Sequence, residues 1–209
     1  ILYYLLPIKR RWIGLLFSSL LFYILTMKSL VVVVLFTTAA IYLGARVIEQ
    51  FNETFKLKKK ELDRAARKEL KNKTTKKIRY VIAFLCFINF GILFVTKYFN
   101  FFGENINALF NALHIPAQIP FLNIFLPLGI SFYTLSAISY VTDVARGVCK
   151  IERNYLRLLL FLIFFPVITE GPISRYGQLG EELKAEHRFD YKQFCFGAQL
   201  ITWGLFQKV

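Results

Sequence analysis

Cysteine and histidine are scarce in this sequence, which has three cysteines and two histidines among 209 residues. Cys86, Cys149 and Cys195 lie far apart and form no CxxC motif, so we expect small apolar fillers and neither a disulfide nor a metal site. His114 and His187 fall outside the apolar segments, where solvated histidines are poor candidates for a general base. We therefore expect no catalytic residue, no metal ligand and no bound cofactor within this chain.

Charged residues are also few, at 19% of the chain, whereas 56% of its residues are hydrophobic. Soluble domains rarely combine so much apolar surface with so little charge. The apolar residues form long runs instead of alternating or amphipathic patterns, as is typical of membrane helices. The sequence predicts one all-α membrane domain over residues 1–209. We expect a polytopic helical bundle with about five to six membrane segments, at least one of them short or re-entrant.

Acidic residues are too few to balance the basic ones, and the formal net charge is +14. The location of the excess argues against a nucleic-acid partner. The loop at 52–79 has twelve Lys or Arg residues against four acids, which accounts for +8 of the total. It lies between two apolar runs, where such a bias marks the cytoplasmic side and suits anionic lipid headgroups. A specific partner for this loop is the alternative.

Six apolar segments can be assigned, at 12–27, 30–48, 80–99, 126–147, 155–168 and 194–209. We expect the first two to form a hairpin, with the basic residues at 9–11 and the 52–79 loop both cytoplasmic. The loop is rich in helix formers and should form a surface helix. Apolar residues at helical spacing within 100–119 predict an interfacial helix on the outer side.

The segment at 126–147, "LPLGISFYTLSAISYVTDVARG", carries many hydroxyl groups for a membrane helix. Small and hydroxyl residues let helices pack closely in lipid, which explains the serines. Gly129, Ser136 and Asp143 fall on one helical stripe, and Tyr133 and Tyr140 lie off it. The acid near the end of the segment can pair with an arginine three residues later.

The segment at 155–168 is short, because 14 helical residues extend about 21 Å against a hydrocarbon core of about 30 Å. "TEGPISRYG" follows at once, so we expect a broken or re-entrant helix. Glu170 and Arg175 flank the Gly-Pro step, and ionisable groups at such depth are paired or functional. The alternatives are a pair that holds the break, of Glu170 with Arg175 or with Arg146, and a polar lining for a substrate path.

Three motifs in order, "LPLGISFYTLSAISYVTDVARG", "FFPVITEGPISRYGQL" and "GLFQKV", resemble the membrane-bound O-acyltransferase family. The likeness is to its bacterial branch of alginate O-acetyltransferases and D-alanyl transfer proteins. It covers 126–208 with matching spacing, whereas the first 120 residues agree only in layout. Leu135-Ser136-Ala137 stands where Phe-Gln-Ser is usual, and Thr169-Glu170 precedes Gly171 where the family has Ala.

The resemblance implies transfer of an acyl group, acetyl above all, to a hydroxyl of an exported polysaccharide or cell-wall polymer. It implies an acyl-CoA or carrier-protein thioester as cytoplasmic donor, an extracytoplasmic acceptor or partner acetyltransferase, and a multi-pass location in the bacterial cytoplasmic membrane. The family's proposed catalytic histidine lies in a later helix, so we expect an N-terminal fragment that is inactive alone. Tyr133, Tyr140, Glu170 and Arg175 are then expected to line the substrate path.

Two other classes of function remain open from the residues alone. Broken helices with midplane polar groups are also found in transporters and flippases, although this chain shows no internal repeat. A non-catalytic membrane scaffold that recruits a soluble partner through the basic loop is the third possibility.

Overall fold

The computed structural model describes residues 2–27, 31–59, 63–121, 129–168, 171, 173–186 and 188–208. The elements are α1 (Leu2–Leu5), η1 (Ile8–Arg10), α2 (Arg11–Met27), α3 (Val31–Lys58), α4 (Arg64–Leu93), η3 (Phe94–Tyr98), α5 (Phe99–Ala112), α6 (Ile130–Arg146), α7 (Tyr155–Ile163), α8 (Phe165–Ile168), η4 (Tyr176–Gly180) and α9 (Tyr191–Lys208). Every regular element in these ranges is helical, and η3 and η4 are π-helical turns.

Two helical runs in the described ranges are long and apolar enough to cross a membrane. One is α3, with 28 residues, and the other is the continuous run of α4, η3 and α5 over Arg64–Ala112, with 49. At about 1.5 Å per residue, each exceeds the hydrocarbon thickness of about 30 Å. The all-α membrane fold is thereby confirmed. Because α2 and α6 have 17 residues each, at the short end of spanning lengths, the number of crossings stays a prediction.

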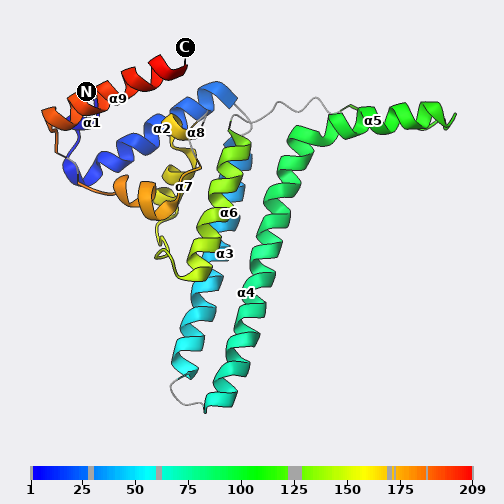
Figure 1. Cartoon of the computed structure of the whole chain (residues 1–209), viewed down its shortest axis with the longest axis horizontal. Helices are drawn as coiled ribbons and strands as arrows, with labels where there is room; N and C mark the ends of the chain where they lie inside the picture. The colour runs from blue at the N-terminus through cyan, green and yellow to red at the C-terminus, as the bar shows by residue number, and fades with distance from the viewer. Residues whose placement is uncertain are drawn as a thin grey trace.

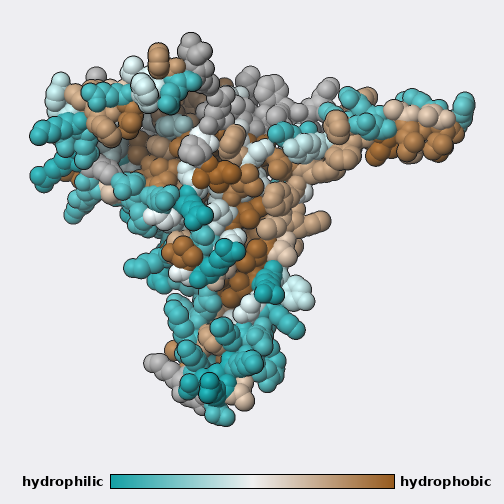
Figure 2. Space-filling view, in the orientation of Figure 1, coloured by the Kyte–Doolittle hydropathy of each residue, from teal (hydrophilic) through white to brown (hydrophobic). Residues whose placement is uncertain are grey.

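α3 and α4 lie side by side as an antiparallel hairpin, and its tip is the basic segment at 52–79 (Figure 1). A helix is present there as expected, but it does not precede the third apolar segment as a helix of its own. The segment instead continues α3 as far as Lys58 and begins α4 at Arg64. Lys, Arg, Glu and Ala are strong helix formers, so both membrane helices propagate through it. Figure 2 shows hydrophilic residues over the tip and hydrophobic ones along the middle of the hairpin.

The helix expected within 100–119 is confirmed as α5, which turns sideways from the end of α4 (Figure 1). It ends where His114 adopts a left-handed backbone, with φ of 55°. The chain then folds back on the helix. The Asn107 side chain donates to the Ile119 carbonyl at 2.9 Å and accepts from its amide at 2.7 Å.

α2 does not run along α3 as the expected hairpin requires. It packs mainly on α7 and α8, and it lies at a steep angle to α3 (Figure 1). α7 provides this surface because every residue from Leu158 to Ile163 is buried. This part of α7 is apolar all round and stabilises the fold by burying its faces against α2, α3 and α6.

The break in the fifth apolar segment comes earlier than expected. The sequence predicts one helix over 155–168, but α7 ends at Ile163 and Phe164 adopts a non-helical ψ of 107°. Pro166 is the cause, because it cannot donate a helical hydrogen bond and clashes with the preceding turn. The chain restarts as the four-residue α8, with Pro166 in its first turn, where proline is tolerated.

Candidate functional site

α6 presents a different face to its neighbours from the one expected. It packs against both α3 and α4. Phe132, which lies on the same helical stripe as Gly129 and Ser136, is 37% exposed. The buried side of the helix includes Ser136 of that stripe, but most of its hydroxyl residues lie off the stripe: Tyr133, Thr134 and Tyr140. Its apolar members are Ile130, Ala137, Val141 and Val144. The hydroxyls therefore meet other helices of this chain.

Tyr133 joins α6 to α3 in the middle of the bundle. Its side chain is 3% exposed, and its hydroxyl donates to the hydroxyl of Thr37. Thr37 in turn donates to the Val33 carbonyl at 2.8 Å. A buried hydroxyl without a partner costs about 1–3 kcal/mol. The chain of donors satisfies both residues and sets the register of α6 against α3.

Tyr140 lies two turns further along α6 and joins it to the connection before α7. Its hydroxyl accepts a hydrogen bond from the Glu152 amide at 3.0 Å. Its ring packs edge-on against Tyr176 of η4, with 4.9 Å between centroids. Both tyrosines are almost completely buried. The helix, the connection and the π-helical turn thus meet at one point.

Glu152 is the charged residue at the centre of this cluster, with 7% of its surface exposed. Its Oε2 accepts from the Tyr176 hydroxyl at 2.6 Å and lies 3.2 Å from Lys184 Nζ. Its Oε1 accepts from the Asn154 amide at 2.9 Å. Lys184 also lies 2.9 Å from the exposed Glu181 and over the Tyr176 ring. Together Tyr176, Lys184 and Asn154 hold a buried carboxylate in its ionised form.

The ionisation of Glu152 reflects two opposing effects. Burial raises the pKa of its carboxyl, but the hydrogen bonds from Tyr176 and Asn154 and the charge of Lys184 outweigh burial and lower the pKa overall. The pKa of Tyr176 is raised, first by burial and then by the same carboxylate. Near neutral pH, Tyr176 is therefore a hydrogen-bond donor and Glu152 an acceptor. Neither group is poised to move a proton.

Of the four residues predicted to line a substrate path, the structure brings Tyr140 into this cluster and places Tyr133 deeper in the bundle. Arg175 is exposed and precedes η4, where its carbonyl accepts from the amides of Gln178 and Leu179 at 3.1 Å. Glu170 lies outside the described residues. Their role in a path stays a prediction.

Sequence reasoning missed Glu152 and Lys184. Both lie in charged stretches that look like solvated linkers, and the carboxylate and ammonium meet only through the tertiary fold. One local signal was available, because Asn154 precedes an apolar run and caps α7 by accepting from the Leu156 amide at 2.9 Å. A cap so close to Glu152 places that acid at the start of a buried helix.

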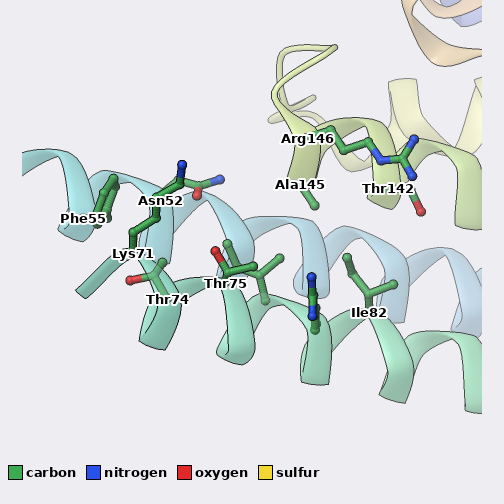
Figure 3. Close-up of a pocket in the computed structure, with 11 residues that line it drawn as sticks. Asn52, Phe55, Lys71, Thr74, Thr75, Ile82, Thr142, Ala145 and Arg146 are labelled. Atoms are coloured by element: carbon green, nitrogen blue, oxygen red, sulfur yellow. The ribbon is translucent and has the colours of Figure 1, made fainter. Parts of the chain in front are cut away.

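A second polar feature is a cavity of about 500 Å³ between α3, α4 and α6, toward the tip of the hairpin (Figure 3). It is lined by Asn52 and Phe55 of α3, by Lys71, Thr74, Thr75, Ile78, Arg79 and Ile82 of α4, and by Thr142, Ala145 and Arg146 of α6. The described lining includes three cations, four hydroxyl or amide side chains and no acid. Such a set suits an anionic ligand.

Comparisons with known proteins find relatives that are named for acyl transfer. The chain is 33% identical to a probable alginate O-acetylase AlgI of Pseudomonas syringae over 132 residues, which are 62% of this chain and 24% of the relative. It is 26% identical to a peptidoglycan O-acetyltransferase of Helicobacter pylori over 58% of this chain and 27% of the relative. It is 34% identical to a teichoic acid D-alanyltransferase of Bacillus subtilis over 39% and 21%.

These similarities confirm the resemblance to the membrane-bound O-acyltransferases that the three motifs indicate. The chain spans about a quarter of the length of the curated relatives it matches. No protein-family model matches it. Comparison with solved structures likewise found no match.

Proposed function

We propose that the protein that carries this chain is a membrane-bound O-acyltransferase. It moves an acyl group, acetyl above all, to a hydroxyl of an exported polysaccharide or cell-wall polymer. The observation that carries the proposal is the similarity to three kinds of curated relative whose names share acyl transfer to a polymer: alginate, peptidoglycan and teichoic acid. The ordered motifs from α6 to α9 support the same conclusion.

The donor in this proposal is an acyl-CoA or a carrier-protein thioester on the cytoplasmic side. The Lys/Arg bias assigns the tip of the α3–α4 hairpin to the cytoplasm of a multi-pass protein in the bacterial cell membrane. The cavity between α3, α4 and α6, which is lined by three cations, lies toward that tip. Phosphate groups of either donor would find Lys71, Arg79 and Arg146 there, with threonine hydroxyls beside them. The acceptor polymer, or a partner acetyltransferase, meets the protein on the opposite side.

Within this enzyme, this chain supplies part of the wall of a substrate path, to which we assign Tyr133, Tyr140, Glu170 and Arg175. Tyr133 and Tyr140 support this wall from inside the bundle, where their hydroxyls already bond Thr37 and the Glu152 amide. The cluster at Glu152 holds η4 against α6, and Arg175 directly precedes η4 with its side chain exposed. Its guanidinium is thus available to a substrate.

Arg175→Gln in the intact protein should reduce acyl transfer at least tenfold, which corresponds to about 1.4 kcal/mol of transition-state stabilisation. The measurement is acyl groups on the polymer per unit of membrane-inserted enzyme. Arg188→Gln is the matched control, since Arg188 is another exposed arginine of the linker before α9, and it should keep wild-type turnover. Equal turnover in both variants would remove Arg175 from the path, and a wild type without acylated product would overturn the proposed function.

Labelling of single cysteines in intact cells tests the proposed orientation. Lys68→Cys, on α4 near the tip of the hairpin, should resist a membrane-impermeant thiol reagent. Asn111→Cys, on α5, should react with it, because the Lys/Arg bias places α5 outside. Both positions are exposed, and reaction after permeabilisation controls for access. The reverse pattern would show that the topology is inverted.

A further inference from the structure

An apolar groove runs along the α3–α4 hairpin. It shares no lining residue with the cavity between α3, α4 and α6. It has a volume of about 590 Å³ and is lined by Phe36, Ala39, Ala40, Leu43, Gly44 and Val47 of α3 and by Tyr80, Val81, Phe84, Leu85 and Ile88 of α4. Small residues form its floor at Ala39, Ala40 and Gly44. Bulky aromatic side chains flank them, and Tyr80 and Phe84 are 76% and 63% exposed.

The same face becomes basic toward the tip of the hairpin. A second hollow of about 310 Å³ is lined by Phe51, Thr54, Phe55 and Lys58 of α3 and by Leu70, Lys73, Thr74, Lys76 and Lys77 of α4. The two hollows share one helical stripe, because residues 40, 44, 47, 51, 54 and 58 of α3 follow each other at spacings of three or four. On α4 the stripe passes through residues 73, 77, 81, 84 and 88 in the same way. The groove is therefore one surface with an apolar end and a basic end.

The charges around the basic end are one-sided. Its described lining has four lysines and no acid. The nearby acids of α3 are engaged elsewhere, with Glu49 2.8 Å from Arg46 and 3.0 Å from Arg153. Lys73 pairs with Glu69, an exposed acid one turn away on α4. Lys77 lies over the Phe51 ring, 5.8 Å from its centroid, so an aromatic face holds its ammonium at the junction of the two ends.

We propose that this groove binds an anionic phospholipid of the leaflet that faces the hairpin tip. The acyl chains lie along Ala39, Ala40 and Gly44, and the lysines bind the phosphate. The change from basic to apolar lining takes place between Lys77 and Val81 of α4, over about 6 Å of helix, as at the boundary between headgroups and hydrocarbon. A soluble acidic partner would match the lysines alone and leave the apolar end uncovered.

Native mass spectrometry tests the site on the intact protein released from detergent with equal amounts of phosphatidylglycerol and phosphatidylcholine. The wild type should retain phosphatidylglycerol preferentially. Lys76→Gln with Lys77→Gln should reduce this preference about thirtyfold, since each of the two lysines near a headgroup contributes about 1 kcal/mol. Arg64→Gln with Lys68→Gln is the matched control, because it removes two exposed charges of the same helix outside the groove and should preserve the preference.

Two further arms separate a lipid from other ligands. Ala39→Phe fills the apolar end and should release the phospholipid although every lysine remains. Excess inorganic phosphate should leave the lipid bound. Displacement by phosphate would indicate a simple anion site, and an equal loss in both double variants would indicate a general effect of net charge. Either result, or equal retention of the two lipids by the wild type, would overturn the proposal, and no arm depends on acyl transfer.

Discussion

Gly129→Ala should destabilise the protein by about 3 kcal/mol, which combines the cost of a left-handed backbone with that of overpacking. Gly129 precedes α6 with φ of 68°, a backbone conformation that residues with a Cβ atom rarely adopt. A Cβ atom there would overlap the carbonyl oxygen of Ile168 and lie 2.6 Å from its Cγ1. Ile168 is buried at the end of α8, so neither atom can move away freely. The measurement is the thermal unfolding midpoint of the purified protein.

Gly147→Ala is the matched control for this prediction. Gly147 ends α6 with nearly the same backbone, φ of 73°, but among the described residues no atom beyond its chain neighbours and the adjoining helix backbone lies within 4 Å of the position that its Cβ would take. The substitution should therefore cost about 1 kcal/mol, from the backbone alone. If both variants unfold at the same temperature, the contact between the start of α6 and the end of α8 does not exist as described.

Glu152→Ala should cost about 3 kcal/mol of unfolding free energy, a typical loss when one partner of a buried charge network is removed. The change leaves the Tyr176 hydroxyl and the Asn154 amide without their acceptor and removes one of the two carboxylates beside Lys184. Denaturant titration of the purified protein measures the loss. Glu181→Gln is the control, because Glu181 contacts the same ammonium from an exposed position, where ion pairs contribute about 0–1 kcal/mol.

The same carboxylate makes stability depend on pH with a definite sign. The pKa of Glu152 is lower in the folded protein than its ordinary value of 4.5, so the folded state binds the proton less readily than the unfolded chain does. Its contribution is complete above that ordinary value and is lost as the pH falls through the folded pKa. Glu152→Gln should flatten this acid-side decrease. An unchanged decrease in this variant would assign the pH dependence to other carboxylates.

The sequence alone determined the class of fold and its main segments. Long apolar runs leave a chain no option in lipid except helices, because each backbone polar group needs an internal partner. The helix at α5 followed from its apolar spacing, and the family resemblance followed from three ordered motifs. All of these properties are local along the chain, so they can be recognised before any segment is placed against another.

Tertiary structure decided what those segments contact. Pro166 was visible in the sequence, yet only the packing of α2 on α7 and α8 shows that the break falls at Phe164. The hydroxyl-rich face of α6 was evident, but its burial against α3 through Tyr133 and Thr37 depends on residues 96 positions apart. Glu152 looked like one acid in a polar connection. It is the centre of a buried cluster because the fold brings Tyr176 and Lys184, which lie 24 and 32 residues later, into contact with its carboxylate. Long-range pairing of this kind depends on how helices pack, and helix periodicity alone does not specify which neighbour each face will meet.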